Sequence, residues 1–253
     1  MDFCLKNKNI LVTGASSGVG RELAVQLVRE GATVGLIGRK LKSLEDLAES
    51  LSTVGIGVPL EVDLTQESSV VDALKRFVGE HGKVDGVALV AGVHEFTPLR
   101  AFSGETHREV MATNVDAQVF FVSQFRRKTI SSRPCSIVMV SSVVSQKGQV
   151  ATVSYAASKG AIESATLSMA AEMVGENIRV NCVRLGYLRS PMTEIWRQSL
   201  GQQAVDRIES SYPLGPGDPT DVAPVISFLL SPVSKWVTGS IIPVDGGYLS
   251  CAR

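Results

Sequence analysis

Cysteine is scarce in this chain, neither sign of charge is in excess, and long apolar runs are missing. The four cysteines lie far apart and form no CxxC pair, which argues against a metal site and a disulfide framework. Because 25 basic residues balance 25 acidic ones, no strong field attracts nucleic acid or an anionic membrane. No run approaches the roughly 18 apolar residues of a membrane span, and the first residues lack a signal-peptide core. The composition predicts a cytoplasmic protein without a metal, a nucleic-acid partner or a membrane segment.

The cysteines and histidines that are present show no pattern typical of catalysis. Cys135 and Cys182 border apolar runs, where a thiol usually behaves as a small buried apolar group. No cysteine has a histidine close to it in the sequence, which argues against a nucleophilic thiol. His81, His94 and His107 fall in loop-like or helix-end contexts, where we expect solvated side chains. His94 stands apart from the other two because it follows a predicted strand end.

Strand-length apolar runs alternate with longer helix-like stretches along the whole chain. The predicted strands are 9–13, 33–37, 57–62, 86–90, 136–140, 179–183 and 240–244, and the predicted helices are 18–30, 41–51, 67–79, 106–129, 155–174 and 220–230. Continuously apolar strands separated by helices are typical of a parallel sheet covered on both faces. The pattern predicts an α/β fold with a Rossmann-type, doubly wound, seven-stranded parallel sheet.

One domain over residues 1–253 is expected, because no linker or repeat interrupts the alternation. The alternation itself breaks at about 187–219, where the chain is long, polar and rich in proline near its end. An insertion near the carboxyl ends of the strands is usually a substrate loop, and we favour that interpretation over a simple surface excursion.

A glycine-rich turn follows the first predicted strand. Gly14, Gly18 and Gly20 lie between that strand and an amphipathic helix. Glycines at such a turn let the backbone approach a pyrophosphate, which then sits on the helix N-terminus. The spacing is Gly-x3-Gly-x-Gly rather than GxGxxG, and many tight strand–helix turns use glycine only for geometry. Its position at the first strand favours a dinucleotide site.

A possible acid/base pair lies in the predicted helix over 155–174. Tyr155 and Lys159 are four residues apart, so they share one face of that helix. An ammonium group one turn from a phenol favours the phenolate, and we therefore expect Lys159 to lower the pKa of Tyr155 from about 10. Such a pair can donate and accept a proton near neutral pH.

The glycine turn and the Tyr155–Lys159 pair together make the chain resemble the short-chain dehydrogenase/reductase family. The resemblance covers essentially the whole chain and includes Asn114, Ser142 and the run Trp236-Val-Thr-Gly. Its nearest likeness is to the 3-oxoacyl-[acyl-carrier-protein] reductase-like branch. The two motifs at this mutual distance are far more specific than either alone.

The resemblance implies a role for each matching catalytic residue. Tyr155 would protonate the carbonyl oxygen as hydride arrives, and Lys159 would hold the nicotinamide ribose. Ser142 would hydrogen-bond the substrate oxygen, and Asn114 would hold a water that links Lys159 to solvent. Ser142 could instead satisfy the backbone at a strand end, and Asn114 could make only a local bond.

Cofactor choice is predicted from the end of the second strand. NAD enzymes place an acidic residue there, whereas this chain has Gly38 followed by Arg39 and Lys40. An arginine can bind a 2′-phosphate with two hydrogen bonds, so NADP(H) is favoured over NAD(H). The alternative is that both cations are ordinary surface charges.

The resemblance also implies a full set of cofactor-binding residues. Asp63 and Leu64 would meet the adenine, although Asp63 could simply form a turn before Thr65. The expected set is Gly14, Ser16, Ser17, Gly18, Val19, Gly20, Arg39, Asp63, Leu64, Ala91, Gly92, Tyr155, Lys159, Gly186, Leu188 and Ser190.

Three positions depart from the family pattern. The family's Asn-Asn-Ala-Gly after the fourth strand appears as Leu89-Val-Ala-Gly92, which removes the amides that tie neighbouring strands. Leu185 stands before Gly186 in place of a proline, and Ser190 replaces a common threonine. These changes bear on loop geometry and cofactor affinity rather than on the reaction class.

The sequence thus predicts an NADP(H)-dependent oxidoreductase that interconverts a carbonyl and a secondary alcohol. The competing hypothesis is a non-catalytic dinucleotide-binding regulatory protein, which has no need of Tyr155. A carrier-linked acyl chain, a nucleotide-activated sugar and a small ketone all remain open as substrates. Arg184, Arg189 and Arg197 are candidates to meet an anionic group. The resemblance also implies a homo-oligomer, either a dimer or a tetramer.

Overall fold

The computed structural model describes residues 2–197 and 201–251, and within them seven strands form one parallel sheet. The strands are β1 (Asn9–Thr13), β2 (Thr33–Gly38), β3 (Ile56–Glu61), β4 (Val84–Leu89), β5 (Ser131–Ser142), β6 (Ile178–Leu185) and β7 (Ile241–Val244). Their order is β3-β2-β1-β4-β5-β6-β7. Strands β2 and β3 are added on one side of β1, and β4 to β7 on the other, so the order reverses between β1 and β4. This confirms the predicted doubly wound sheet, in which ligands bind at the switch point.

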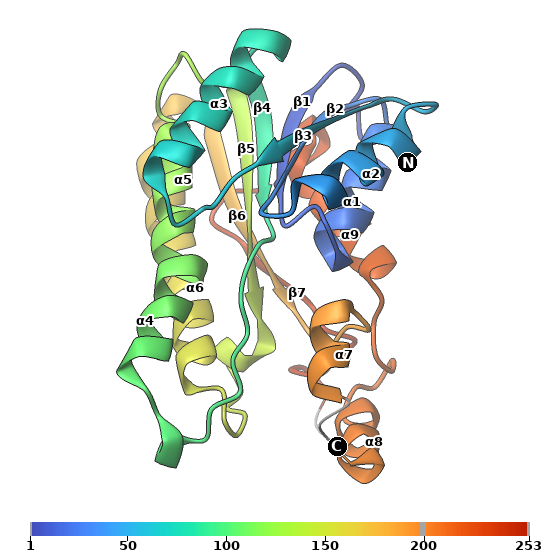
Figure 1. The fold of residues 1–253 in the computed structure, drawn as a ribbon, viewed down its shortest axis with the longest axis vertical. Helices are drawn as coiled ribbons and strands as arrows, with labels where there is room; N and C mark the ends of the chain where they lie inside the picture. The colour runs from blue at the N-terminus through green and yellow to red at the C-terminus, as the bar shows by residue number, and fades with distance from the viewer. Residues whose placement is uncertain (1, 198–200, 252–253) are drawn as a thin grey trace.

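Helices cover both faces of the sheet (Figure 1). One face carries α1 (Gly18–Arg29), α2 (Leu41–Leu51) and α9 (Pro219–Leu230), and the other carries α3 (Glu67–His81), α5 (Ala117–Gln124) and α6 (Val153–Met173). Successive side chains of a strand point to opposite faces. Ile10 and Val12 of β1 accordingly join the apolar cluster under α1 and α9, whereas Leu11 joins the cluster under α3 and α6.

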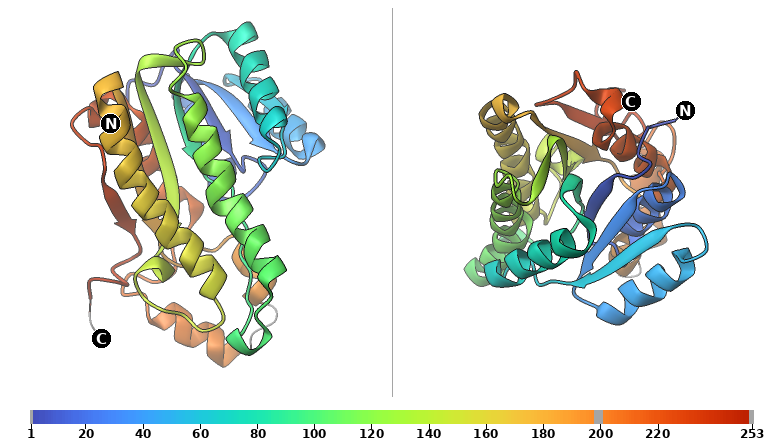
Figure 2. Two further views of the ribbon diagram at one scale, coloured as in Figure 1. Left: turned by 90° about the vertical axis from the view of Figure 1, so that its left-hand side faces the viewer. Right: turned by 90° about the horizontal axis from the view of Figure 1, so that it is seen from above.

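The helix predicted over 106–129 is not one regular helix. The structure has α4 (Gly104–Met111), a π-helical turn η2 (Ala112–Asp116) and then α5, which ends at Gln124. Backbone turns replace the helix after that point: the amide of Phe125 bonds to Val122, and that of Ile130 to Arg127. The predicted end at residue 129 is therefore wrong. Figure 2 shows this segment lying beside α6 along the length of the molecule.

The segment at about 187–219 forms two short helices, α7 (Pro191–Arg197) and α8 (Gln202–Ser210). They lie beyond the carboxyl end of the sheet, in the lower part of Figure 1. Residues 198–200 of this predicted substrate loop lie outside the described residues. Its two ends are joined by a backbone bridge between Leu188 and Gly217, which fixes the loop against the strand ends.

Three-residue 3-10 helices lie in some of the connections between the longer elements. They are η1 (Leu99–Ala101), η3 (Val143–Ser145), η4 (Val174–Glu176) and η5 (Pro232–Ser234). The turn η3 follows β5 directly and so begins at the carboxyl end of a central strand. None of the helices in the described ranges is long and apolar enough to cross a membrane.

Candidate active site

The glycine turn after β1 requires glycine at two kinds of position. Gly14 and Gly18 have φ values of +71° and +54°, in the left-handed region that other residues rarely adopt. A Cβ on Gly20 would lie 2.3 Å from the carbonyl oxygen of Gly14, so only glycine allows α1 to start this close to the turn. Ser17 precedes α1 without a side-chain capping bond. The helix α1 thus begins directly at a tight glycine turn, and binding of a phosphate group there stays a prediction.

Arg39 and Lys40 are exposed at the carboxyl end of β2. A Cβ on Gly38 would lie 3.8 Å from the hydroxyl of Ser16, so the end of β2 adjoins the glycine turn. Arg39 forms no ion pair with any residue in the described ranges. The exposed guanidinium of Arg39 lies near the glycine turn, and its charge contributes to the lowered pKa of Asp63.

Asp63 makes the local turn that the sequence left open as an alternative. Its Oδ1 accepts hydrogen bonds from the amide of Thr65 at 3.0 Å and from the Thr65 hydroxyl at 2.7 Å. These two bonds hold the pKa of Asp63 below its usual range. Both go to one carboxylate oxygen, and a role of Asp63 and Leu64 toward adenine stays a prediction.

The backbone after β4 is held by three side chains from other elements. The hydroxyl of Thr13 accepts from the amide of Ala91 at 3.0 Å, and the amide of Gln118 donates to the Ala91 carbonyl at 2.8 Å. Asn114 accepts from the amide of Val93 and donates to its carbonyl. These bonds replace the strand ties that the missing amides at Leu89 and Val90 would have supplied.

Asn114 is completely buried in η2 and has its amide group fully engaged. Besides its two bonds to Val93, it donates to the hydroxyl of Ser158 on α6 at 3.0 Å. A Cβ on Gly92 would lie 3.1 Å from Asn114 Oδ1 and 3.5 Å from the ammonium of Lys159. The side chain thus makes the local bonds of the alternative interpretation, close to Lys159.

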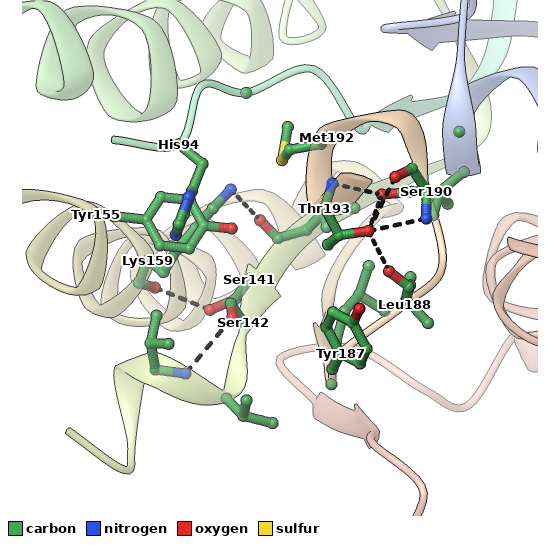
Figure 3. Close-up of a pocket in the computed structure, with 18 of the residues that line it drawn as sticks. His94, Ser141, Ser142, Tyr155, Lys159, Tyr187, Leu188, Ser190, Met192 and Thr193 are labelled. Atoms are coloured by element: carbon green, nitrogen blue, oxygen red, sulfur yellow. Dashed lines mark hydrogen bonds between the residues drawn. The ribbon is translucent and has the colours of Figure 1, made fainter. Parts of the chain in front are cut away.

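Ser142, Tyr155 and Lys159 converge on one cavity (Figure 3). Ser142 ends β5, and the other two lie one turn apart on α6. Ser142 and Tyr155 both line this cavity, and the amide of Val144 lies 3.5 Å from the Ser142 hydroxyl. Lys159 donates to the carbonyl of Val140 at 3.0 Å and lies 5.5 Å from the centre of the Tyr155 ring. The structure brings the predicted catalytic group together.

The pKa values in this group differ from the sequence prediction. Burial raises the pKa of Tyr155 to about 12, although the nearby hydroxyl of Ser142 opposes that change. Burial also lowers the pKa of Lys159 to about 8. The expected lowering of the Tyr155 pKa by Lys159 is therefore wrong for this structure, because loss of water around the phenol dominates. The phenol is protonated at neutral pH and suited to donate.

His94 lines the same cavity, so the expectation of a solvated side chain is wrong for this residue. Its ring lies between those of Phe96 and Tyr155, with centroids 4.2 Å and 4.1 Å away. Burial, with a smaller contribution from the charge of Lys159, lowers its pKa to about 4. His94 follows β4, whose carboxyl end faces the site, and that position was the available sequence signal.

Aromatic and apolar side chains form the opposite wall of the cavity. Tyr187 and Tyr212 are buried there with ring centroids 6.1 Å apart, and Tyr212 stacks on Tyr248 at 4.5 Å. Met192 and Ile208 line the cavity from α7 and α8. This wall comes from the segment that the sequence analysis singled out as a substrate loop.

The three cofactor-site residues expected after β6 also border the cavity. A Cβ on Gly186 would lie 2.8 Å from the Cα of Asp245, so the chain after β6 passes too close for a larger residue. Leu188 is buried at the loop bridge. Ser190 is bonded to Thr193, whose hydroxyl also donates to the Leu188 carbonyl at 2.6 Å. Thr193 was not singled out from the sequence.

The arginines proposed to meet an anionic group are each beside a carboxylate. Arg184 forms a close ion pair with Glu163 at 2.7 Å. Arg189 lies 3.8 Å from Asp218, and Arg197 lies 3.9 Å from Glu194. The structure therefore gives no support to their role as a free anion site.

Two of the four cysteines are buried, as predicted. Cys135 and Cys182 are buried, and burial raises the pKa of both thiols to about 12. Over residues 2–197 and 201–251, no cluster of three metal-ligating side chains was found.

Comparison with known proteins points to one family. A family model described as enoyl-(acyl carrier protein) reductase matches residues 14–249. The chain is 37% identical over 248 residues to a 3-oxoacyl-[acyl-carrier-protein] reductase of Thermotoga maritima, covering 96% of this chain and 98% of the relative. It is 33% identical over 248 residues to a gluconate 5-dehydrogenase of Gluconobacter oxydans, covering 97% and 96%. A crystal structure of a short-chain type dehydrogenase/reductase from Mycobacterium marinum matches with a TM-score of 0.90 at 28% identity, covering 99% and 98%.

Proposed function

The chain belongs to the short-chain dehydrogenase/reductase family, and from that premise we propose that it interconverts a carbonyl and a secondary alcohol with NADP(H), using Tyr155 as the acid/base. The observation that carries this proposal is the convergence of Ser142, Tyr155 and Lys159 on a cavity that also reaches the glycine turn. A non-catalytic binder would have no use for such a group. The cradle at Gly14 and Gly20, which a Cβ would fill, fits a bound dinucleotide.

Proton transfer is the part of the reaction that the chain itself supplies. A bound nicotinamide carries hydride to or from the reacting carbon. As alkoxide charge develops on the substrate oxygen, the hydroxyl of Tyr155 donates its proton and Ser142 donates a hydrogen bond. The raised pKa of Tyr155 keeps this proton in place until the oxygen becomes basic. Lys159, one turn further along α6, lines the same cavity and would hold the nicotinamide ribose.

The charge at the end of β2 supports NADP(H) over NAD(H). Gly38 leaves no carboxylate to repel a 2′-phosphate, and the exposed guanidinium of Arg39 has no ion-pair partner in the described residues. Lys40 adds a second cation at the start of α2. A phosphate beside these groups would gain charge-assisted hydrogen bonds that a ribose hydroxyl cannot form.

The substrate side of the cavity suits a carbonyl compound with an apolar portion. Tyr187, Tyr212, Met192 and Ile208 offer apolar surface from the substrate loop. The two relatives named above act on a carrier-linked acyl group and on gluconate, so substrates of different size remain candidates.

The test is NADPH oxidation against a carrier-linked 3-oxoacyl chain, a nucleotide-activated keto sugar and small free ketones. We expect turnover with one class, and a loss of about 10²–10⁴-fold in Tyr155→Phe, which removes only a hydroxyl. Tyr248→Phe is the matched control, because Tyr248 packs on Tyr212 behind the cavity wall. Near-normal turnover by Tyr155→Phe would show that another group supplies the proton.

A further inference from the structure

Glu163 is a buried carboxylate that the reaction itself does not use. It lies one turn after Lys159 on α6, and only 7% of its surface is exposed. Its two oxygens accept hydrogen bonds from Ser141 at 2.8 Å, Ser145 at 2.6 Å and Gln146 at 3.2 Å. The hydrogen bonds from Arg184, Ser145 and Ser141 together outweigh the effect of burial and hold the pKa of Glu163 below its usual range. The carboxylate is ionised inside the protein.

Arg184 of β6 is the counter-charge. Its Nε and Nη2 donate to the two oxygens of Glu163, both at 2.7 Å, in a two-pronged ion pair. The side chains of Arg184 and Glu163 are only 15% and 9% exposed. Such a pair has a fixed geometry, since a guanidinium and a carboxylate meet in one plane.

The hydrogen bonds of Glu163 go to residues on both sides of Ser142, the residue proposed to hydrogen-bond the substrate oxygen. Ser141 precedes Ser142, and its hydroxyl contacts both Glu163 and the carbonyl of Lys159 at 3.1 Å. The hydroxyl of Ser145 contacts Glu163 and also the carbonyl of Ser142 at 2.8 Å. The strand end that presents Ser142 is thereby tied to the helix that presents Lys159.

A contribution to stability alone does not explain why Glu163 and Arg184 form a buried ion pair next to the end of β5. Removing two charges from water is costly, and apolar residues of similar volume often replace a buried ion pair without loss of stability. A fully bonded polar network, by contrast, admits few arrangements of the groups that it joins. Here those groups are Ser142 at the end of β5 and the acid/base helix α6.

We propose that Glu163 and Arg184 are positioning residues, which hold the turn after β5 so that Ser142 stays aligned with Tyr155 and Lys159. The inference rests on the proposed function, because alignment matters only if these groups react. Both residues would act indirectly, through the residues that they hold in place, since neither Glu163 nor Arg184 lines the cavity.

The decisive variant replaces the pair by apolar residues of similar size, Glu163→Leu/Arg184→Met. We expect its melting temperature to stay near that of the wild type while kcat falls by about 10- to 100-fold, since a misplacement of about 1 Å can cost 10²-fold. KM for the cofactor should change less than twofold. Glu163→Gln, which leaves Arg184 unpaired, should lose both stability and kcat. A double variant with wild-type kcat would overturn the proposal.

A second measurement does not depend on turnover. Hydrogen–deuterium exchange of the peptide over 142–147 should speed up in the double variant, while exchange in β1 and β4 stays unchanged. Arg76→Met/Glu80→Leu is the matched control, because it removes an exposed ion pair on α3. Unchanged exchange over 142–147 would also overturn the proposal. If the wild-type protein were inactive on every carbonyl class, the proposed function would be refuted. Hydrogen–deuterium exchange over 142–147 would still show whether Glu163 and Arg184 hold the turn after β5.

Discussion

The imidazole of His94 packs edge-on against the phenol of Tyr155, with ring centroids 4.1 Å apart and an angle of 82° between the rings. Phe96 also packs on the imidazole in a T-shaped arrangement, with ring centroids 4.2 Å apart. The edge of one ring against the face of the next is a favourable arrangement that restrains both. His94 therefore fixes one side of the proposed acid while remaining neutral itself.

The first prediction concerns stability at mildly acidic pH. The pKa of His94 is lowered from 6.5 to about 4, so between these values the unfolded chain binds a proton that the folded chain does not. Stability must then fall as the pH drops from 6.5 toward 4. We expect the melting temperature to fall more between pH 7 and pH 5 in the wild type than in His94→Gln. Identical falls in the two proteins would show that His94 titrates normally.

The second prediction concerns cofactor choice. Arg39→Ala should weaken NADPH binding by about 10- to 100-fold, the equivalent of roughly 1.5–3 kcal/mol for a bond to a charged group. NADH binding should be nearly unchanged, because that cofactor has no 2′-phosphate to lose a partner. Fluorescence titration of both cofactors measures the difference, with Arg29→Ala at the far end of α1 as the control. An equal loss for the two cofactors, or none, would make Arg39 a bystander.

The third prediction concerns the glycine turn. In Gly20→Ala the new Cβ would lie 2.3 Å from the Gly14 carbonyl, so the turn must open and cofactor affinity must fall with stability. Gly79→Ala is the control, since a Cβ there meets nothing within 4 Å in helix α3. It should raise the melting temperature, because alanine is favoured over glycine in a helix by roughly 0.5–1 kcal/mol. If Gly20→Ala bound the cofactor with wild-type affinity, the hypothesis that the glycine turn holds the dinucleotide would be refuted.

Local sequence patterns predicted the parts of this structure that depend on neighbouring residues. The spacing of Tyr155 and Lys159 fixes their shared helix face, and the alternation of apolar runs fixes the parallel sheet. Gly14 and Gly20 follow the first strand, so their close approach could be expected from the turn alone. These features need no knowledge of which elements pack together.

Features that arise between distant elements could not be predicted in this way. Glu163 and Arg184 lie on a helix and a strand, and neither position carries a sign of its partner. The neutral state of His94 comes from its burial against Phe96 and Tyr155, which only the folded chain creates. The raised pKa of Tyr155 has the same origin. Burial reversed a prediction that considered only the nearest charge.

Apolar side chains remain exposed on the layer formed by α4, η2, α5 and α6. Val119, Val153 and Leu167 are 38%, 47% and 53% exposed, and all three lie on α5 or α6. At the far edge of the sheet Trp236 is 96% exposed, next to the edge strand β7. Interaction sites on proteins are often rich in exposed apolar side chains, and an edge strand is usually covered.

The final prediction is that a second copy of the chain covers this layer. Light scattering after size exclusion should give two or four times the 26.9 kDa of one chain. Leu167→Lys should shift the mass toward one chain, because a charge placed in an apolar interface must be desolvated without a partner. Val54→Lys, at an exposed apolar position between α2 and β3, is the control and should leave the mass unchanged. A wild-type mass near 27 kDa at micromolar concentration would refute the oligomer. An oligomeric wild type that Leu167→Lys leaves intact would move the interface to another face, with the edge beside Trp236 as the next to test.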